Sequence, residues 1–106
     1  MRRYRSLHEV TESYYRDHPE EIDEFLQITF EEYAQDSDTG ALLSALRIIG
    51  RVKGISALAE ETGLTRQGVQ KALSPNGNPR LENVNALLRA MGYRLIPRKL
   101  EGAEIK

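Results

Sequence analysis

Residues 55–73 read Ile-Ser-Ala-Leu-Ala-Glu-Glu-Thr-Gly-Leu-Thr-Arg-Gln-Gly-Val-Gln-Lys-Ala-Leu, and this stretch decides the fold. It predicts two short helices joined by a tight turn at Gly63, since glycine best accepts the left-handed conformation that ends a helix. Ser56 and Thr65 are predicted to cap the two helices, because their hydroxyls can accept hydrogen bonds from first-turn amides. Ala59 is small enough to let two helices pass closely. The second helix should therefore stand at a steep angle to the first and project from the surface.

The second helix of the pair has two different faces. Val69 and Leu73 are predicted to point at the core. The side chains left for solvent are those of Arg66, Gln67, Gln70 and Lys71. These residue types make paired hydrogen bonds to guanine or adenine edges, or bind phosphates. The pattern favours a helix-turn-helix that enters a DNA major groove, while an ordinary pair of surface helices remains the alternative.

Two resemblances support the first interpretation. With Ala59, Gly63 and Val69 at the diagnostic places, the stretch from Ser56 to Leu73 resembles the helix-turn-helix of phage-repressor-like (Cro/C1-type) domains. The run Lys71-Ala-Leu-Ser-Pro-Asn-Gly-Asn-Pro79 is more specific, and it resembles the HigA-like probable addiction module antidote proteins of bacteria. The second similarity covers about residues 18–98, and it includes Leu81–Met91, Gly92-Tyr-Arg-Leu, Tyr33, Leu42, Leu43, Ala45 and Arg51-Val-Lys-Gly54.

The resemblance implies a lambda-repressor-like, all-α fold and two functions: repression of the protein's own operon and neutralisation of a RelE/HigB-like toxin. In repressor-like domains the positions of Arg66 and Gln67 are the usual base readers. Lys71 could reach a base or a phosphate, and Gln70 is a further candidate for base reading. The candidates for phosphate contact are Ser56 and Thr65 at helix N-termini, and Asn76, Asn78 and Arg80 in the following loop. Turn chemistry alone also explains asparagine and glycine in that loop.

Length and composition fit one cytoplasmic domain. A chain of 106 residues can close a single core. It has no cysteine, which excludes disulfides and thiolate metal sites and is compatible with a reducing cytoplasm. No apolar run approaches a membrane span, and the start Met-Arg-Arg-Tyr-Arg lacks the apolar core of a signal peptide. We therefore expect a cytoplasmic protein without membrane contact.

Charge is strongly segregated along the chain. Residues 8–38 hold eleven Asp or Glu against one Arg, whereas residues 51–99 hold nine Lys or Arg against three Glu. The basic part contains the predicted helix-turn-helix, which suggests two separate binding functions. A solvated acidic helix that needs no partner is the alternative. The candidates for contact with a basic toxin are Glu20, Glu21, Asp23, Glu24, Glu31 and Glu32.

The remaining pattern is helical. A short helix is expected at 6–15, and a stronger one starts at Pro19 and breaks at Asp36–Gly40. The next helix should end at Gly54, and another should carry Leu81, Val84, Leu87, Leu88 and Met91 on one face. Alternation at Tyr93–Pro97 predicts one short C-terminal strand. The domains are then an acidic helical extension at 1–37, the helix-turn-helix domain at 38–100 and a tail at 101–106.

Partners and chemistry can also be bounded. One helix-turn-helix makes few base contacts, so a homodimer on double-stranded operator DNA is expected, with the 93–97 strand as one possible interface. Leu88 and Met91 are the competing interface, although such residues are more often simply part of the core. His8 and His18 lack the pattern of a metal site, and no glycine run follows a strand, so we expect no enzyme, metal or cofactor. The alternatives left open are a stand-alone helix-turn-helix regulator and a protein-interaction module without DNA binding.

Overall fold

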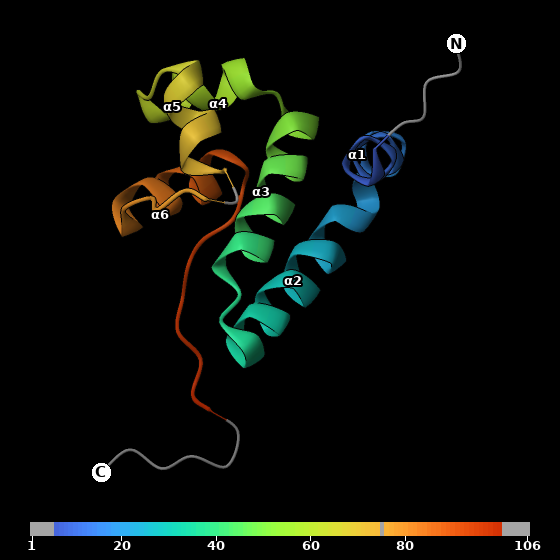
Figure 1. The fold of residues 1–106 in the computed structure, drawn as a ribbon, viewed down its shortest axis with the longest axis vertical. Coiled ribbons are helices and arrows are strands. Elements are labelled where there is room, and N and C mark those ends of the chain that lie inside the picture. Colours follow the sequence, from blue (N-terminus) through green and yellow to red (C-terminus); the bar gives the residue numbers. More distant parts are fainter. Residues whose placement is uncertain (1–5, 75, 101–106) are drawn as a thin grey trace.

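The computed structural model describes residues 6–74 and 76–100, and that part of the chain is helical. Figure 1 shows α3 running through the middle, with α2 on one side and α4, α5 and α6 on the other. The elements are α1 (Leu7–Asp17), the 3-10 turn η1 (Pro19–Glu21), α2 (Ile22–Asp36), α3 (Thr39–Lys53), α4 (Ile55–Thr62), α5 (Arg66–Ala72) and α6 (Leu81–Ala90). The predicted all-α class is therefore confirmed for the described residues.

The core forms around α3. Its inward side chains are spaced three to four residues apart, so they line one face of the helix. Leu43, Leu46 and Ile49 are at most 2% exposed. They belong to one apolar cluster that also includes Ile22, Leu26, Leu58, Val69, Leu73, Leu87, Leu88 and Met91. Because every helix from α2 to α6 contributes to this cluster, the orientation of each depends on the others.

Most predicted helix ends are confirmed. Gly63 ends α4 in the left-handed conformation with φ 79°, and Thr65 caps α5. Asp38, within the predicted break, caps α3 by accepting from the amide of Ala41. Gly92 has φ 97° directly after α6. These ends are set by local backbone chemistry, which the sequence displays directly.

The predicted cap at Ser56 is wrong. Gly54 is the N-cap of α4, and its φ of 107° and ψ of 113° turn the chain directly from α3 into α4. Ile55 is then the first helical residue, and its side chain is only 8% exposed. Burial of Ile55 accounts for the earlier helix start, and it leaves Ser56 in the first turn.

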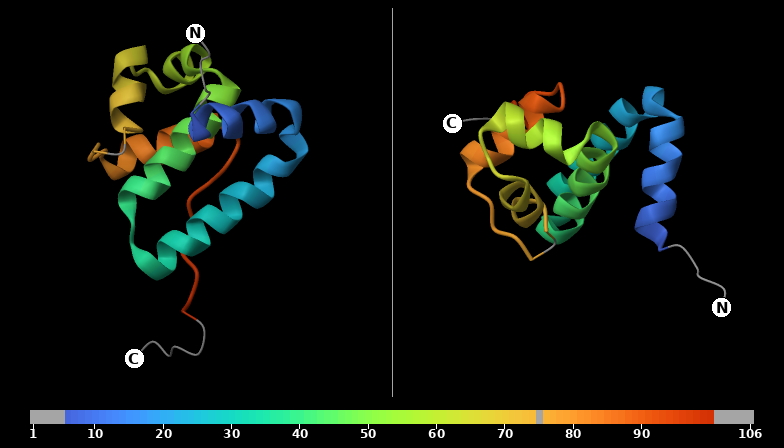
Figure 2. Two further views of the ribbon diagram at one scale, coloured as in Figure 1. Left: turned by 45° about the vertical axis from the view of Figure 1, so that its right-hand side comes forward. Right: turned by 90° about the horizontal axis from the view of Figure 1, so that it is seen from above.

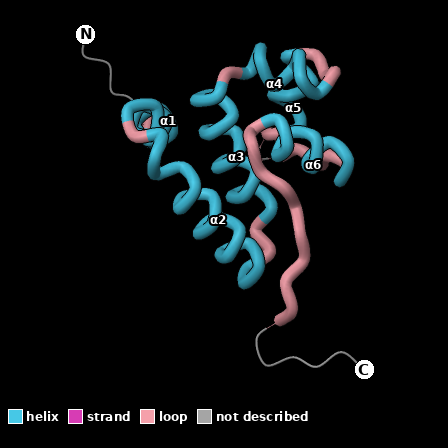
Figure 3. Tube along the Cα trace, turned by 180° about the vertical axis from the view of Figure 1, so that it is seen from behind, coloured by secondary structure: helices cyan, strands magenta, loops and turns pink. Residues whose placement is uncertain are grey.

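The predicted strand at Tyr93–Pro97 is also wrong. Residues 93–100 run as a loop past the helices toward the C-terminal end of α2, as Figure 3 shows. No backbone hydrogen bond joins residues 94–100 to another described residue, and a strand needs such a ladder. The predicted tail at 101–106 lies outside the described residues.

In α6 the structure corrects one prediction and decides one alternative that the sequence left open. Leu81 was expected on the apolar face but is 71% exposed, since it is the first residue of the helix and projects from its free end. Leu88 and Met91 are each only 2% exposed, so they are core residues rather than a dimer surface.

Candidate nucleic-acid interface

The turn before α5 is fixed by one side chain. The Thr65 hydroxyl accepts a hydrogen bond from the amide of Gly68 at 2.9 Å, as an N-cap should. A side chain at position 68 would crowd this bond, because a Cβ added to Gly68 would lie 3.1 Å from the Thr65 Oγ1. The first residue of α5 is therefore fixed by a local interaction between Thr65 and Gly68.

Packing fixes which way α5 faces. Val69 and Leu73 are 0% and 1% exposed, as predicted. Buried Gly50 of α3 lets the helices approach closely, since a Cβ there would lie 3.3 Å from Cδ1 of both Leu58 and Leu73. α5 is thus held against α3 and α4 along its apolar side.

The opposite side of α5 is open, as the sequence predicts. The side chains of Arg66, Gln67, Gln70 and Lys71 are all exposed. Gln67, Gln70 and Lys71 are spaced by three and four residues, so they share one face of the helix. None of the four side chains forms a hydrogen bond or ion pair within residues 6–74 and 76–100. Their donors are therefore available for a ligand.

The acidic part of the chain does not cover this face. Figure 2 shows α1 on one side of α3 and the α4–α5 pair on the other, and Figure 1 agrees. Among the tertiary contacts, α1 packs on α3 whereas α5 packs on α4. The separation of charge along the sequence is thus also a separation in space.

The loop after α5 packs closely against that helix. The amide of Gly77 donates to the carbonyl of Ser74 at 2.8 Å. A Cβ added at Gly77 would lie 2.7 Å from the Lys71 carbonyl and 3.1 Å from that of Ala72. Sequence reasoning had explained this glycine by turn chemistry alone, because nothing local reveals that it lies against the end of α5.

The predicted phosphate-contacting residues are all exposed, at the starts of α4 and α5 and in the segment between α5 and α6. Ser56 lies in the first turn of α4, where amides have no acceptor within the helix. The Thr65 hydroxyl already accepts from Gly68. Asn76 and Asn78 are exposed, and the Arg80 guanidinium lies 3.5 Å from the Glu82 carboxylate with both side chains mostly in solvent. An ion pair this exposed holds Arg80 only weakly.

The acidic candidates are mostly in solvent. Glu20, Asp23, Glu24, Glu31 and Glu32 are exposed, and Glu21 is half-buried. Glu21 and Asp23 are engaged with tyrosines: Tyr14 Oη donates to Glu21 at 2.8 Å, and Tyr93 Oη donates to Asp23. Burial, followed by this bond, raises the pKa of Tyr93 to about 12. The Asp23 bond ties the segment after α6 to α2.

Sequence reasoning missed one grouping. His18 Nδ1 lies 3.4 Å from a Glu20 carboxylate oxygen and 3.7 Å from one of Glu21. The tilted rings of Tyr14 and His18 are 4.5 Å apart. The hydrogen bond from Tyr14 to Glu21 is the main reason that the pKa of Tyr14 is raised. The three side chains of His18, Glu20 and Glu21 could offer ligand atoms to a cation, but all are partly or fully exposed. The spacing of His8 and His18 in the sequence could not reveal this cluster of His18, Glu20 and Glu21.

Comparison with known proteins defines the class. The family model described as "Probable addiction module antidote protein" matches residues 6–98. The chain belongs to this family, so it is related to the antidote of a toxin, as the resemblance implies. An "Uncharacterized protein" of Haemophilus influenzae is 35% identical over 72 residues, which cover 68% of this chain and 74% of that protein. No solved structure matches the chain significantly. None of the described helices is long and apolar enough to cross a membrane.

Proposed function

We propose that this chain is the antitoxin of a type II toxin–antitoxin module, which represses its own operon through α5 and neutralises a RelE/HigB-like toxin. One observation carries the DNA-binding part: four donor-bearing side chains without described partners lie on the open face of a helix whose other face is locked in the core. Family membership supports the antitoxin part.

In this proposal, Arg66 and Gln67 at the first turn of α5 read base edges in the major groove, and Gln70 and Lys71 extend the contact along the helix. The phosphate contacts are assigned to Ser56, Thr65, Asn76, Asn78 and Arg80. Two copies would bind half-sites about one helical turn apart, because a single recognition helix covers few base pairs.

The test replaces the two base readers by alanine. Arg66→Ala/Gln67→Ala should weaken binding to the duplex upstream of the protein's own operon by about 100-fold, since two bidentate contacts are lost. Arg89→Ala/Gln35→Ala is the matched control, because it removes the same side-chain types from exposed positions on α6 and α2. Both variants should keep the helical circular-dichroism spectrum of the parent.

Band shifts at several salt concentrations separate this proposal from its rival, an interaction module without DNA binding. Phosphate contacts should make the affinity of the parent fall steeply with salt. Equal operator affinity of the parent and Arg66→Ala/Gln67→Ala would refute the assignment of α5.

The toxin-binding part is tested separately. The proposed contact is the acidic N-terminal third, including Glu20, Glu21, Asp23, Glu24, Glu31 and Glu32. The product of the neighbouring reading frame should co-purify with the full chain and be inhibited by it. Failure to co-purify would favour a stand-alone regulator.

A further inference from the structure

α1 presents its apolar side to solvent. Leu7, Val10 and Tyr14 are 78%, 49% and 44% exposed, and none of the residues of α1 is buried. They are spaced by three and four residues, so their side chains form one stripe along the helix. Surface helices normally turn such a stripe toward the core, and here it is left uncovered by the described chain.

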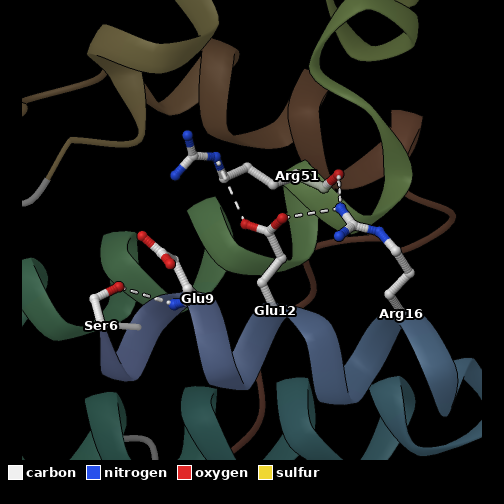
Figure 4. Close-up of polar contacts among 5 residues, drawn as sticks. All are labelled: Ser6, Glu9, Glu12, Arg16 and Arg51. Atoms are coloured by element: carbon white, nitrogen blue, oxygen red, sulfur yellow. Dashed lines mark hydrogen bonds and ion pairs between the residues drawn. The ribbon is translucent and has the colours of Figure 1, made fainter. Parts of the chain in front are cut away.

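The other side of α1 faces the molecule, where Tyr15 packs against the apolar cluster and polar side chains reach α3. Glu12 lies between two guanidinium groups, 2.9 Å from Arg16 and 3.7 Å from Arg51 of α3. Arg16 also donates to the backbone carbonyl of Arg51 at 3.3 Å. Figure 4 shows Glu12 and Arg16 reaching from α1 toward Arg51, while Ser6 caps the helix through the amide of Glu9. To bury its stripe, α1 would have to roll and break the two contacts to Arg51, whereas the Glu12–Arg16 pair lies within α1.

The stripe ends at an acidic corner. Tyr14, its last member, donates to Glu21, and Glu20 lies beside it near His18. The Glu20 and Glu21 side chains are 67% and 44% exposed. The surface therefore combines an apolar centre with a negative rim at one end, an arrangement typical of a protein-binding site.

We infer that Leu7, Val10 and Tyr14, which we name the α1 stripe, form the apolar centre of the surface that binds a basic toxin. The inference rests on the proposed antitoxin function. Charge favours this occupant: the exposed Glu20 and Glu21 carboxylates lie at one end of the stripe, and residues 8–38 hold eleven acidic residues and one arginine, so a basic partner is attracted.

The experiment measures toxin affinity with the full chain and the purified product of the neighbouring reading frame, the proposed toxin. Leu7→Ser/Val10→Ser removes two exposed apolar side chains and should leave the fold intact. Its Kd for the toxin should rise by about 30-fold or more, as expected when two aliphatic contacts are lost from an interface. Leu81→Ser is the matched control, since it removes an equally exposed leucine from α6, and it should keep the parental Kd.

Operator affinity is the second measurement. It should stay within about threefold of the parent in Leu7→Ser/Val10→Ser, because α1 and α5 lie on opposite sides of α3. If the parent binds toxin and Leu7→Ser/Val10→Ser binds it equally tightly, the role inferred for the α1 stripe is wrong, while the proposed antitoxin function stands. If that variant keeps its toxin affinity but no longer self-associates, the α1 stripe binds a second copy of the chain, and the inferred toxin contact is wrong. A parent that does not bind toxin refutes the antitoxin proposal itself.

Discussion

The hydroxyl oxygen of Thr65 should contribute measurably to the stability of α5, the proposed recognition helix. The Thr65 Oγ1 accepts from the Gly68 amide at 2.9 Å, and α5 is only seven residues long. A helix this short cannot form alone, so it depends on its cap and on the packing of Val69 and Leu73. Thr65→Val removes the acceptor and nearly keeps the shape of the side chain.

The cost can be worked from this geometry. Loss of a threonine N-cap typically destabilises a protein by about 1 kcal/mol. The Gly68 amide is only partly buried, so water replaces some of the lost bond and the upper end of the range is not reached. For a domain of this size, about 1 kcal/mol lowers Tm by roughly 5 °C. The core contacts of Val69 and Leu73 remain, so unfolding should stay a single transition.

Thermal unfolding followed by circular dichroism measures this effect. Thr65→Ser keeps the acceptor and should unfold within about 2 °C of the parent, because only a methyl group is lost from an exposed position. Thr29→Val is the matched control, since the Thr29 hydroxyl only donates to the carbonyl of Phe25 within α2. If Thr65→Val melts with the parent, the cap does not hold α5 and the reasoning is refuted.

Three further predictions follow from other contacts. Gly77→Ala should lower the free energy of unfolding, measured in urea, by about 1–3 kcal/mol, because the new Cβ would lie 2.7 Å from the carbonyl oxygen of Lys71. A variant as stable as the parent would contradict the close packing of this loop. In the same assay, Leu73→Ala should lower the free energy of unfolding by about 2–5 kcal/mol, because Leu73 is 1% exposed. Leu81→Ala should lower it by less than about 0.5 kcal/mol, because Leu81 is 71% exposed. The pKa of Tyr93 is raised from its ordinary value of 10 to about 12. The Tyr93 hydroxyl should therefore contribute fully to the free energy of unfolding below pH 10, and this contribution should be lost as the pH rises toward 12. In an absorbance titration, Tyr93→Phe should remove a tyrosine that titrates well above pH 10; an unchanged curve would contradict this.

The turn between α4 and α5 could be predicted because its causes are local. Gly63 takes a left-handed conformation and Thr65 caps the next amide, and both effects depend only on neighbouring residues. Ser56 failed as a cap because the burial of Ile55 decides where α4 begins, and burial depends on the whole fold. The strand at 93–97 failed for a related reason, since alternation predicts an extended backbone but cannot supply a neighbouring strand.

The residues proposed for binding could be predicted in part. Val69 and Leu73 fix the inner side of α5, so periodicity alone identifies the exposed set. In α1, periodicity identifies an apolar stripe but not its direction. The fold decides that direction, because it packs α1 on α3 and brings Glu12 within 3.7 Å of Arg51, thirty-nine positions later in the chain.

If both proposals hold, the two surfaces are linked through charge rather than through contact. A basic toxin on the α1 stripe would neutralise much of the acidic N-terminal third and lower its repulsion of operator phosphates. That third lies across α3 from α5, in a molecule whose shorter axes are 31 and 27 Å, and the Debye length at physiological salt is about 8 Å. Screening should therefore suppress the effect in the cell. Toxin should tighten operator binding at low salt and lose this influence near 0.15 M, unless it contacts DNA itself.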